Sequence, residues 1–422
     1  VQMGNIVLHP CTYLHNYRKT NPEKLEQNQY KEYVEDAPIF GRGEVPKLRE
    51  FIKNSVKTGD DKQLLYDIDH GKIRPSKSLQ DAIKSMIEGN QEFIMLDEQK
   101  VVYEEILKNV MMCMADQTVI VKGGPGTGKT VVAVNLLAKL TNDGMFAQYT
   151  SKNSAPRNVY AKKLTGHRKS SINNMFKGSG SYVDAEPNSI DAVICDEAHR
   201  LNDKSGMFHN LGENQIKEII NAALCSIFFI DESQRVTLSD IGSVAEIRRW
   251  ADELESEVME MELVSQFRCN GSDGYLAWLD DVLEIRETAN FDLKDIKIVD
   301  SPNEVRDLII ERNRVHNRAR ILAGYCWAWI KAGQNNTDVH DIKIGDFGMS
   351  WNLGNTTTFA IDETSVNEVG CIHTSQGLEF DYAGVIIGDD MRYQDGHIVT
   401  DFTKRAKTDQ SLKGIKKLYR EN

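Results

Sequence analysis

The stretch VKGGPGTGKTVVAV, residues 121–134, constrains the fold of this chain more than any other. It follows a short apolar run at 118–121 and leads into an apolar segment from about 129 to 140. Its closely spaced glycines allow the backbone to turn tightly, so that N–H groups and the start of a helix face one anion. A strand, G-x-x-x-x-G-K-T and a helix in this order predict a P-loop for the phosphates of ATP. The alternative, a glycine-rich turn without a ligand, is disfavoured by the complete motif.

The last two residues of the motif have separate expected roles. Lys129 is expected to reach the β- and γ-phosphates, and Thr130 to bind Mg²⁺ through its hydroxyl. The loop residues expected to bind ATP are Gly124, Pro125, Gly126, Thr127, Gly128, Lys129 and Thr130.

Two further apolar runs end in polar residues. In AVICDEAHRL (192–201), Asp196 is placed to hold Mg²⁺, and Glu197 to orient and deprotonate the attacking water. The alternative is that the two carboxylates simply begin a helix. In FFIDESQR (228–235), Gln234 could contact both the γ-phosphate and this water. Here the alternative is a helix cap, since Asp231 and Ser233 are both good N-cap residues.

The apolar pattern of residues 96–390 predicts an α/β fold. Short unbroken apolar runs alternate with helical stretches such as 96–112 and 214–224, which indicates a parallel sheet covered on both faces. Residues 331–368 are rich in Gly, Asn, Asp and Thr, and an insertion or long loop is expected there. The expected strands are 118–121, 192–195, 226–230, 320–325, 370–372 and 383–388.

Composition limits the class of protein. A length of 422 residues suggests two or three domains, and a net charge of −12 argues against a sequence-blind cationic binder. A local basic groove could still bind nucleic acid. The basic run at 404–420 is expected to be a solvated helical face. The seven cysteines form no CxxC pair, which favours a reducing cytoplasm without structural zinc, and neither a signal peptide nor a membrane-spanning run is apparent.

Five motifs in order carry a family resemblance: GGPGTGKT, CDEAHR, IDESQR, LVSQFRCN and IHTSQGLEFDYAGVI. Across about residues 90–390 they resemble the superfamily 1 helicase core, and more closely the bacterial Schlafen group 3-like DNA/RNA helicases. The DEAH letters are typical of superfamily 2, but the glutamine of the third motif and QGLEFD fit superfamily 1 better. The resemblance implies a P-loop NTPase with two RecA-like parallel-sheet lobes, 91–305 and 306–422, after a mixed accessory region, 1–90.

The resemblance also implies roles for single residues. Gln99 would read the adenine edge, and Glu379 would contact the ribose. Phe267 would stack on the adenine, with core packing as the alternative, and Arg268 would stabilise the γ-phosphate. Gln376 and Gly377 would lie between ATP and the nucleic acid. The implied catalytic set is Lys129, Asp196, Glu197, Gln234 and Arg268.

The stretch YTSKNSAPRNV (149–159) matches the first nucleic-acid-contacting motif of such motors. Thr150, Ser151, Lys152 and Arg157 are expected to contact the backbone of single-stranded DNA or RNA, and such contacts carry no sequence information. An ordinary polar loop is the alternative. Trp327 and Trp329 could stack on bases, but burial in the second lobe is favoured.

The chain departs from the family at its end. Related proteins continue into a motif with a second arginine, and Arg392, Arg405 and Arg420 lie in no matching motif. The second lobe is therefore expected to be incomplete at its C-terminus. Because an arginine finger is worth about 10³–10⁵ in rate, hydrolysis is expected to be weak. A chain that opens on Val1 is expected to be a fragment or a processed form.

These features predict an ATP-dependent, cytoplasmic nucleic-acid motor or remodelling ATPase that uses ATP and Mg²⁺. The alternative is a nucleotide-gated switch or scaffold that presents a partner or a nuclease without unwinding. A role in antiphage defence is compatible with the resemblance. A metabolic kinase is disfavoured, since it would leave the QFR and QGLEFD segments unexplained.

Overall fold

A computed structural model of the chain describes residues 9–19, 30–57, 95, 97–112, 116–164, 174–206, 210–264, 273–288, 296–330, 336, 338–352, 358–412 and 414–415. It divides into two compact units, residues 1–75 and 76–422. The domain boundary expected at residue 90 lies outside the described residues. Within the ranges above, no helix is long and apolar enough to cross a membrane.

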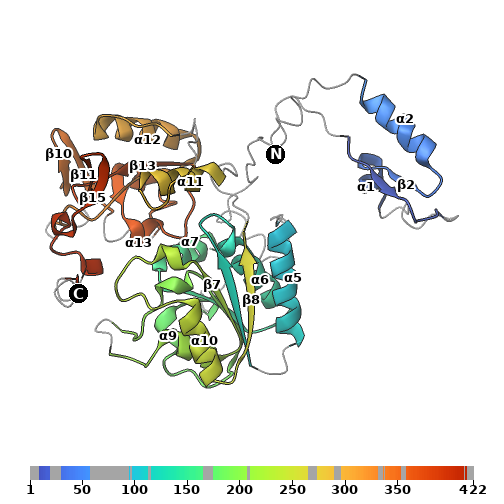
Figure 1. The fold of residues 1–422 in the computed structure, drawn as a ribbon, viewed down its shortest axis with the longest axis horizontal. Helices are drawn as coiled ribbons and strands as arrows, with labels where there is room; N and C mark the ends of the chain where they lie inside the picture. Colours follow the sequence, from blue (N-terminus) through green and yellow to red (C-terminus); the bar gives the residue numbers. More distant parts are fainter. Residues whose placement is uncertain are drawn as a thin grey trace. The chain divides into compact units, whose positions relative to one another are not determined.

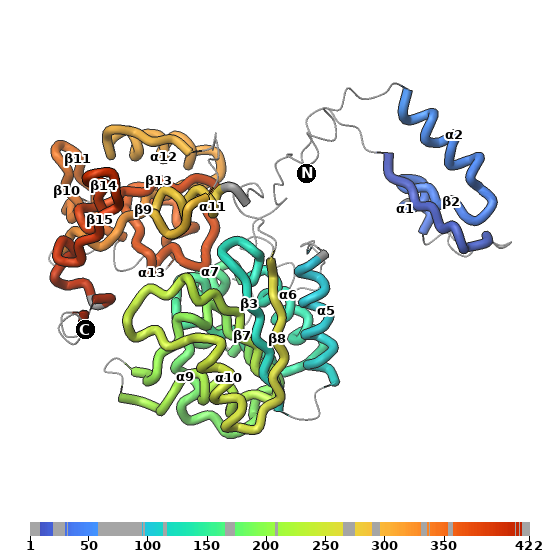
Figure 2. The backbone as a smooth tube through the Cα atoms, in the orientation of Figure 1, coloured from blue at the N-terminus to red at the C-terminus, as the bar shows by residue number. Residues whose placement is uncertain are grey.

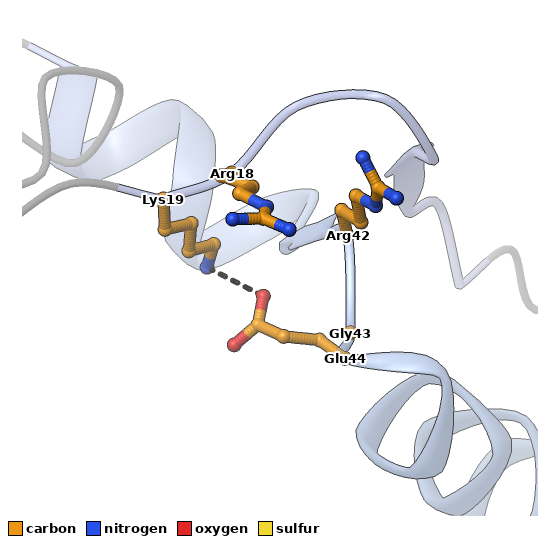
Figure 3. A pocket seen from close by; sticks show the side chains of 5 residues that line it. All are labelled: Arg18, Lys19, Arg42, Gly43 and Glu44. Atoms are coloured by element: carbon orange, nitrogen blue, oxygen red, sulfur yellow. Dashed lines mark ion pairs between the residues drawn. The ribbon is translucent and has the colours of Figure 1, made fainter.

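The first unit is small. In its described part, the short strands β1 (Thr12–Leu14) and β2 (Ile39–Gly41) pair in parallel, and the helices are α1 (Lys31–Asp36) and α2 (Val45–Ser55). Beside them, a cavity of about 480 Å³ has a largely basic lining, in which Lys19 and Glu44 form an ion pair at 3.3 Å (Figure 3). The lining residues are Arg18, Lys19, Arg42, Gly43 and Glu44.

The second unit begins with a lobe built on a six-stranded sheet of order β5-β4-β6-β7-β3-β8, in which every pair is parallel. The strands are β3 (Gln117–Gly123), β4 (Ala147–Ser151), β5 (Phe176–Gly178), β6 (Ile190–Cys195), β7 (Ala223–Ile230) and β8 (Glu257–Leu263).

Helices cover both faces of this sheet because the buried strands are apolar on both sides. Along β3, Val119 and Val121 join one buried cluster, and Ile120 joins the other. In Figure 1, α5 and α6 lie on one side of the sheet, and α9 and α10 on the other. The helices and short turns are α5 (Asp97–Met112), α6 (Lys129–Asn142), α7 (Ser154–Lys163), η2 (Ser179–Tyr182), η3 (Ala198–Arg200), α9 (Gln215–Ala222), η4 (Glu232–Gln234) and α10 (Val244–Glu253).

The second lobe carries a five-stranded sheet of order β10-β11-β12-β9-β13, parallel except for the β10–β11 pair. Its strands are β9 (Ala319–Ala323), β10 (Ile342–Ile344), β11 (Phe347–Trp351), β12 (Glu368–Gly370) and β13 (Tyr382–Ile386), followed by the hairpin β14 (Met391–Gln394) and β15 (His397–Thr400). Its helices and turns are α11 (Asp273–Val282), α12 (Pro302–His316), η7 (Glu363–Asn367), α13 (Ile372–Ser375), η8 (Phe402–Lys404) and η9 (Gln410–Leu412).

The predicted fold class is confirmed: the second unit is an α/β P-loop NTPase with two sheet-based lobes. The expectation of a long loop at 331–368 is wrong, because β10 and β11 lie there and extend the second sheet, while the alternative of an insertion stays a prediction. The described part of the basic run at 404–420 forms short 3₁₀ turns instead of the expected helical face. Trp327 and Trp329 pack, partly buried, against the core of the second lobe.

Candidate nucleotide-binding site

The sheet order brings three polar strand ends together. Strand β7 lies between β3 and β6, and all three are parallel, so their carboxyl ends meet at one edge (Figure 2). The P-loop follows β3, Asp231 follows β7, and Asp196 follows β6. A crevice outside the carboxyl ends of strands is where open α/β sheets bind their ligands.

The P-loop has a left-handed backbone at two glycines. Gly126 has φ 79° and Gly128 has φ 86°, a region that side chains other than glycine rarely adopt. Gln99 of α5 packs against this loop, since its Nε2 donates to the Thr127 carbonyl at 3.1 Å. A Cβ at Gly128 would lie 2.1 Å from the same nitrogen. Gln99 therefore contacts the loop backbone, and its expected contact with adenine stays a prediction.

The Lys129 ammonium lies inside the loop. Its Nζ donates to the carbonyls of Gly123 at 2.7 Å and Gly124 at 2.8 Å, and lies 3.9 Å from Asp231 Oδ2. The residue is 7% exposed. The cation thus occupies the concave side of the loop, within reach of the position where a phosphate would neutralise it.

Thr130 and Asp196 lie in direct contact. The Thr130 hydroxyl and the Tyr149 hydroxyl both donate to Asp196 Oδ2 at 2.8 Å, and the Glu197 amide donates to Oδ1 at 3.0 Å. Burial and the charge of Glu197 raise the pKa of Asp196, while the two hydroxyl donors act against this. Burial also raises the pKa of Tyr149 well above its ordinary value. A hydroxyl and a carboxylate at this distance form the oxygen donor set that Mg²⁺ prefers.

Glu197 is held in an unusual conformation. Its φ of 55° and ψ of 43° are left-handed. Its Oε2 lies 3.1 Å from His199 Nε2 and accepts from Gln376 Nε2 at 3.4 Å. The Asp231 amide donates to His199 Nδ1 at 3.3 Å, so His199 Nε2 carries the proton and donates to Glu197. His199 is fully buried, and its part in the site was not predicted from the sequence.

Gln234 lies in the short turn after β7. Asp231 caps this turn by accepting from the Ser233 amide at 3.1 Å, as the helix-cap alternative predicts. Gln234 Nε2 donates to Asp231 Oδ2 at 2.7 Å, and the same oxygen faces the Lys129 ammonium. Gln234 is therefore tied to the P-loop lysine through Asp231. Its contact with the γ-phosphate stays a prediction.

The structure corrects part of the expected nucleic-acid interface. Thr150 and Ser151 are fully buried in β4, and their hydroxyls donate to the carbonyls of Lys177 at 3.2 Å and Asn153 at 2.8 Å. Neither hydroxyl is therefore placed to meet a polymer backbone. Strand β4 is buried along its whole length, although its sequence contains the polar residues Gln148, Thr150 and Ser151. Burial also lowers the pKa of Arg157, which is partly exposed.

Lys152 belongs to a buried polar cluster around Asp240. Its Nζ donates to Asp240 Oδ1 at 2.8 Å and to Asn202 Oδ1 at 2.7 Å, while Arg200 Nε donates to Asp240 Oδ2 at 2.9 Å. Burial acts to raise the pKa of Asp240, but donors from Lys152 and Thr237 lower it to about 2. The lysine side chain is still 24% exposed, so it can also face a ligand.

Of the other expected residues, some lie outside the described part of the chain, and the roles of the rest stay predictions. Phe267, Arg268 and Arg420 fall outside the described residues. Arg405 forms an ion pair with Asp409 at 2.7 Å. Glu379 and Arg392 are half-buried, and the expected contact of Glu379 with the ribose stays a prediction.

A family model and a protein of known sequence match most of the chain. The family described as "Schlafen group 3, DNA/RNA helicase domain" matches residues 116–422. An uncharacterized protein of Saccharomyces cerevisiae is 23% identical over 317 residues, which cover 65% of this chain and 68% of that protein.

Two solved structures of replication proteins also match part of the chain. A DNA replication initiation factor has a TM-score of 0.25 at 16% identity, over 52% of this chain and 58% of that one. The replication initiator DnaA bound to AMPPCP and single-stranded DNA has a TM-score of 0.23 at 18% identity, over 44% of this chain and 51% of that one. The chain thus spans little more than half the length of these solved chains.

Proposed function

Because the chain belongs to the Schlafen group 3 DNA/RNA helicase domain family, we propose that it is an ATP-dependent motor or remodelling ATPase acting on single-stranded nucleic acid. The observation that carries this proposal is the meeting of Lys129, the Thr130–Asp196 pair and Glu197 at the ends of adjacent parallel strands. These are the parts that phosphoryl transfer needs: a phosphate cradle, a metal-holding pair and a carboxylate for the attacking water.

Each group of the site would have one task. The backbone amides of residues 124–130 would bind the phosphates, and Lys129 would leave the carbonyls of Gly123 and Gly124 to reach them. Thr130 and Asp196 would hold Mg²⁺, which would offset charge on the phosphate oxygens. Glu197 would orient the water and accept its proton, while the His199 N–H keeps the carboxylate in place.

The test is ATP turnover by the wild type and by Lys129→Ala. Loss of the loop cation is expected to lower turnover by about 10²–10³ and to weaken ATP binding. Lys122→Ala is a matched control, because Lys122 lies on β3, the strand that leads into the P-loop, but pairs with Glu260 at 3.3 Å. Equal turnover in wild type and Lys129→Ala would reject the site.

Nucleic-acid action is tested by adding single-stranded DNA or RNA. We propose that the polymer contacts the exposed parts of Lys152, which precedes helix α7, and of Arg157, which lies in its first turn. Strong stimulation of turnover by either polymer supports a motor. A flat response supports the second candidate, a nucleotide-gated switch or scaffold that presents a nuclease or another defence partner. That candidate is favoured by one observation: a residue of the second lobe, Gln376, contacts Glu197 directly.

A further inference from the structure

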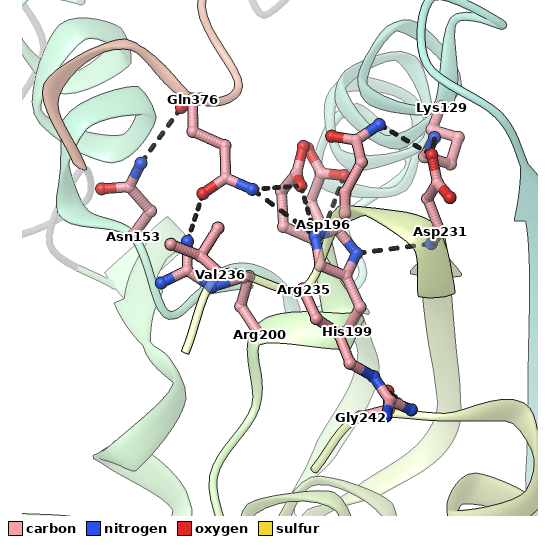
Figure 4. Close-up of polar contacts among 12 residues, drawn as sticks. Lys129, Asn153, Asp196, His199, Arg200, Asp231, Arg235, Val236, Gly242 and Gln376 are labelled. Carbon is pink, nitrogen blue, oxygen red and sulfur yellow. Dashed lines mark hydrogen bonds and ion pairs between the residues drawn. The ribbon is translucent and has the colours of Figure 1, made fainter. Parts of the chain in front are cut away.

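Gln376 belongs to the second lobe but lies in the site of the first. It follows α13 and is 9% exposed. Its carbonyl accepts from Asn153 Nδ2 at 3.1 Å, and its Oε1 accepts from Arg200. Its Nε2 donates to Glu197 Oε2 at 3.4 Å and lies 3.5 Å from His199 Nε2. Every polar group of its side chain is therefore used by the first lobe (Figure 4).

The next two residues hold Gln376 there. Gly377 has φ 78°, and a Cβ on it would lie 2.9 Å from Pro156 Cγ of helix α7. Leu378 is 6% exposed and belongs to the apolar core of the first lobe. We name residues 376–378 the inserted segment. Its glycine allows close approach to α7, and its leucine anchors it by burial.

The consequence falls on Glu197. Both donors, His199 and Gln376, converge on the single oxygen Oε2. Hydrogen bonds to a carboxylate favour its charged form and make it a poorer proton acceptor. The Glu197 side chain is also only 10% exposed in this arrangement. A base held in this way is not free to take a proton from water.

We propose that Gln376 is a positioning residue that restrains Glu197 while the inserted segment lies against it, and that withdrawal of this segment releases the carboxylate for turnover. This inference rests on the proposed function. The same contacts would allow bound nucleic acid to affect Glu197 indirectly. Asn153 holds the Gln376 carbonyl and caps α7, so a strand bound beside Lys152 would act on Gln376 through Asn153.

The test is Gln376→Met, which keeps the length of the side chain and removes its hydrogen bonds. Turnover without nucleic acid is expected to rise about 3- to 10-fold, the worth of one or two hydrogen bonds. The KM for ATP should change by less than about 2-fold, because no contact with substrate is removed. Stimulation by single strands should fall, since the restraint is already gone. Ser375→Ala is the matched control, because Ser375 Oγ donates to the Cys371 carbonyl at 2.9 Å, within the short helix α13 itself.

Unchanged or slower basal turnover in a folded Gln376→Met protein overturns the inference, because a merely structural residue would give that result. If Gln376→Met has a much lower Tm than the wild type, the variant Asn153→Ser tests the inference instead. Serine still caps α7 but is too short to reach the Gln376 carbonyl, so basal turnover should again rise. No rise overturns the inference. A wild type without ATP turnover rejects the proposed function itself, whereas normal wild-type turnover with unresponsive variants rejects the inference alone.

Discussion

Asp196 is surrounded by groups that suit a neutral side chain as well as a charged one. Its Oδ2 meets two hydroxyls, Thr130 and Tyr149, which can each turn to accept as well as donate. Its Oδ1 meets the Glu197 amide, which can only donate. An asparagine could therefore keep all three hydrogen bonds. What it would lose is the negative charge that a magnesium ion needs.

Asp196→Asn is accordingly expected to stabilise the nucleotide-free protein while abolishing turnover. The folded state raises the pKa of Asp196, so its carboxylate destabilises the fold as pH rises above the ordinary value of 3.8. The Tm of the Asp196→Asn variant should exceed that of the wild type by about 1–3 °C at pH 7. This difference in Tm should disappear below pH 3.8, where the carboxyl is protonated in both the folded and the unfolded state. Thermal melts across pH check this. A lower Tm for the variant at pH 7 would show that the charge is favourable even without metal.

At the residue scale, sequence reasoning finds groups that recur at fixed spacing. Lys129 and Thr130 follow from the loop motif, and Asp196 from its place after an apolar strand. His199 could not be found in this way, because its contact with Glu197 depends on a left-handed backbone at Glu197. The burial of Thr150 was missed because a polar strand looks like a polar loop until its neighbours are known.

Among the elements, the loop between β7 and α10 is tied down by Asp240. This side chain accepts from Lys152 and Arg200, and from the amides of Val236 and Thr237 at 2.9 Å. Removing its charge would leave two partly buried cations without a counter-ion. The loop thus depends on one carboxylate for its position beside the predicted nucleic-acid surface.

Asp240→Asn is expected to lower the free energy of unfolding by about 3–5 kcal/mol at pH 7. Because the pKa of Asp240 is lowered from 3.8 to about 2, its contribution is present above pH 3.8 and is lost as pH falls toward 2. Denaturant unfolding at several pH values should show the gap between wild type and variant narrowing over that interval. Asp203→Asn, an exposed neighbour, is the control, and an equal effect there would contradict the assignment.

Gly377→Ala tests the packing of the inserted segment on α7. The change imposes a left-handed alanine, at roughly 1–2 kcal/mol, and a Cβ close to Pro156. Gly396→Ala imposes the same strain at φ 88° in a hairpin turn with nothing within 4 Å. The Tm should fall further for Gly377→Ala than for Gly396→Ala. Equal losses would mean that the contact with Pro156 adds nothing to stability.

At the element scale, the strands with long apolar runs were predicted and the others were missed. Strand β7 was expected at 226–230 and begins earlier, at Ala223, because Ala223 and Leu224 continue the apolar run. Strand β8 alternates acidic and apolar residues at the sheet edge, so it shows no unbroken run. Strands β10 and β11 are short and flank a tight turn at Gly345, which gives their segment the composition of a loop.

For the whole molecule, ligand binding should report on both lobes together. Saturating ATP with Mg²⁺, at about 100 times the Kd, is expected to stabilise the folded chain by about 2.7 kcal/mol. The resulting rise in Tm should shrink when EDTA removes the metal, because Thr130 and Asp196 would then lose their shared ligand. Differential scanning calorimetry measures both. A rise that is insensitive to EDTA would argue against the metal-holding pair.

The first lobe does not complete its own interior. Leu378 and Ala360, from far along the polypeptide, fill places in the core beneath α6 and α7. A fragment that ends at residue 305 would lack both side chains and would expose the apolar surface that they cover. Exposed apolar surface of this kind favours aggregation. A minimal ATP-binding fragment would therefore need polar substitutions at the newly exposed apolar positions. Alternatively, it would have to retain the segments that carry Ala360 and Leu378.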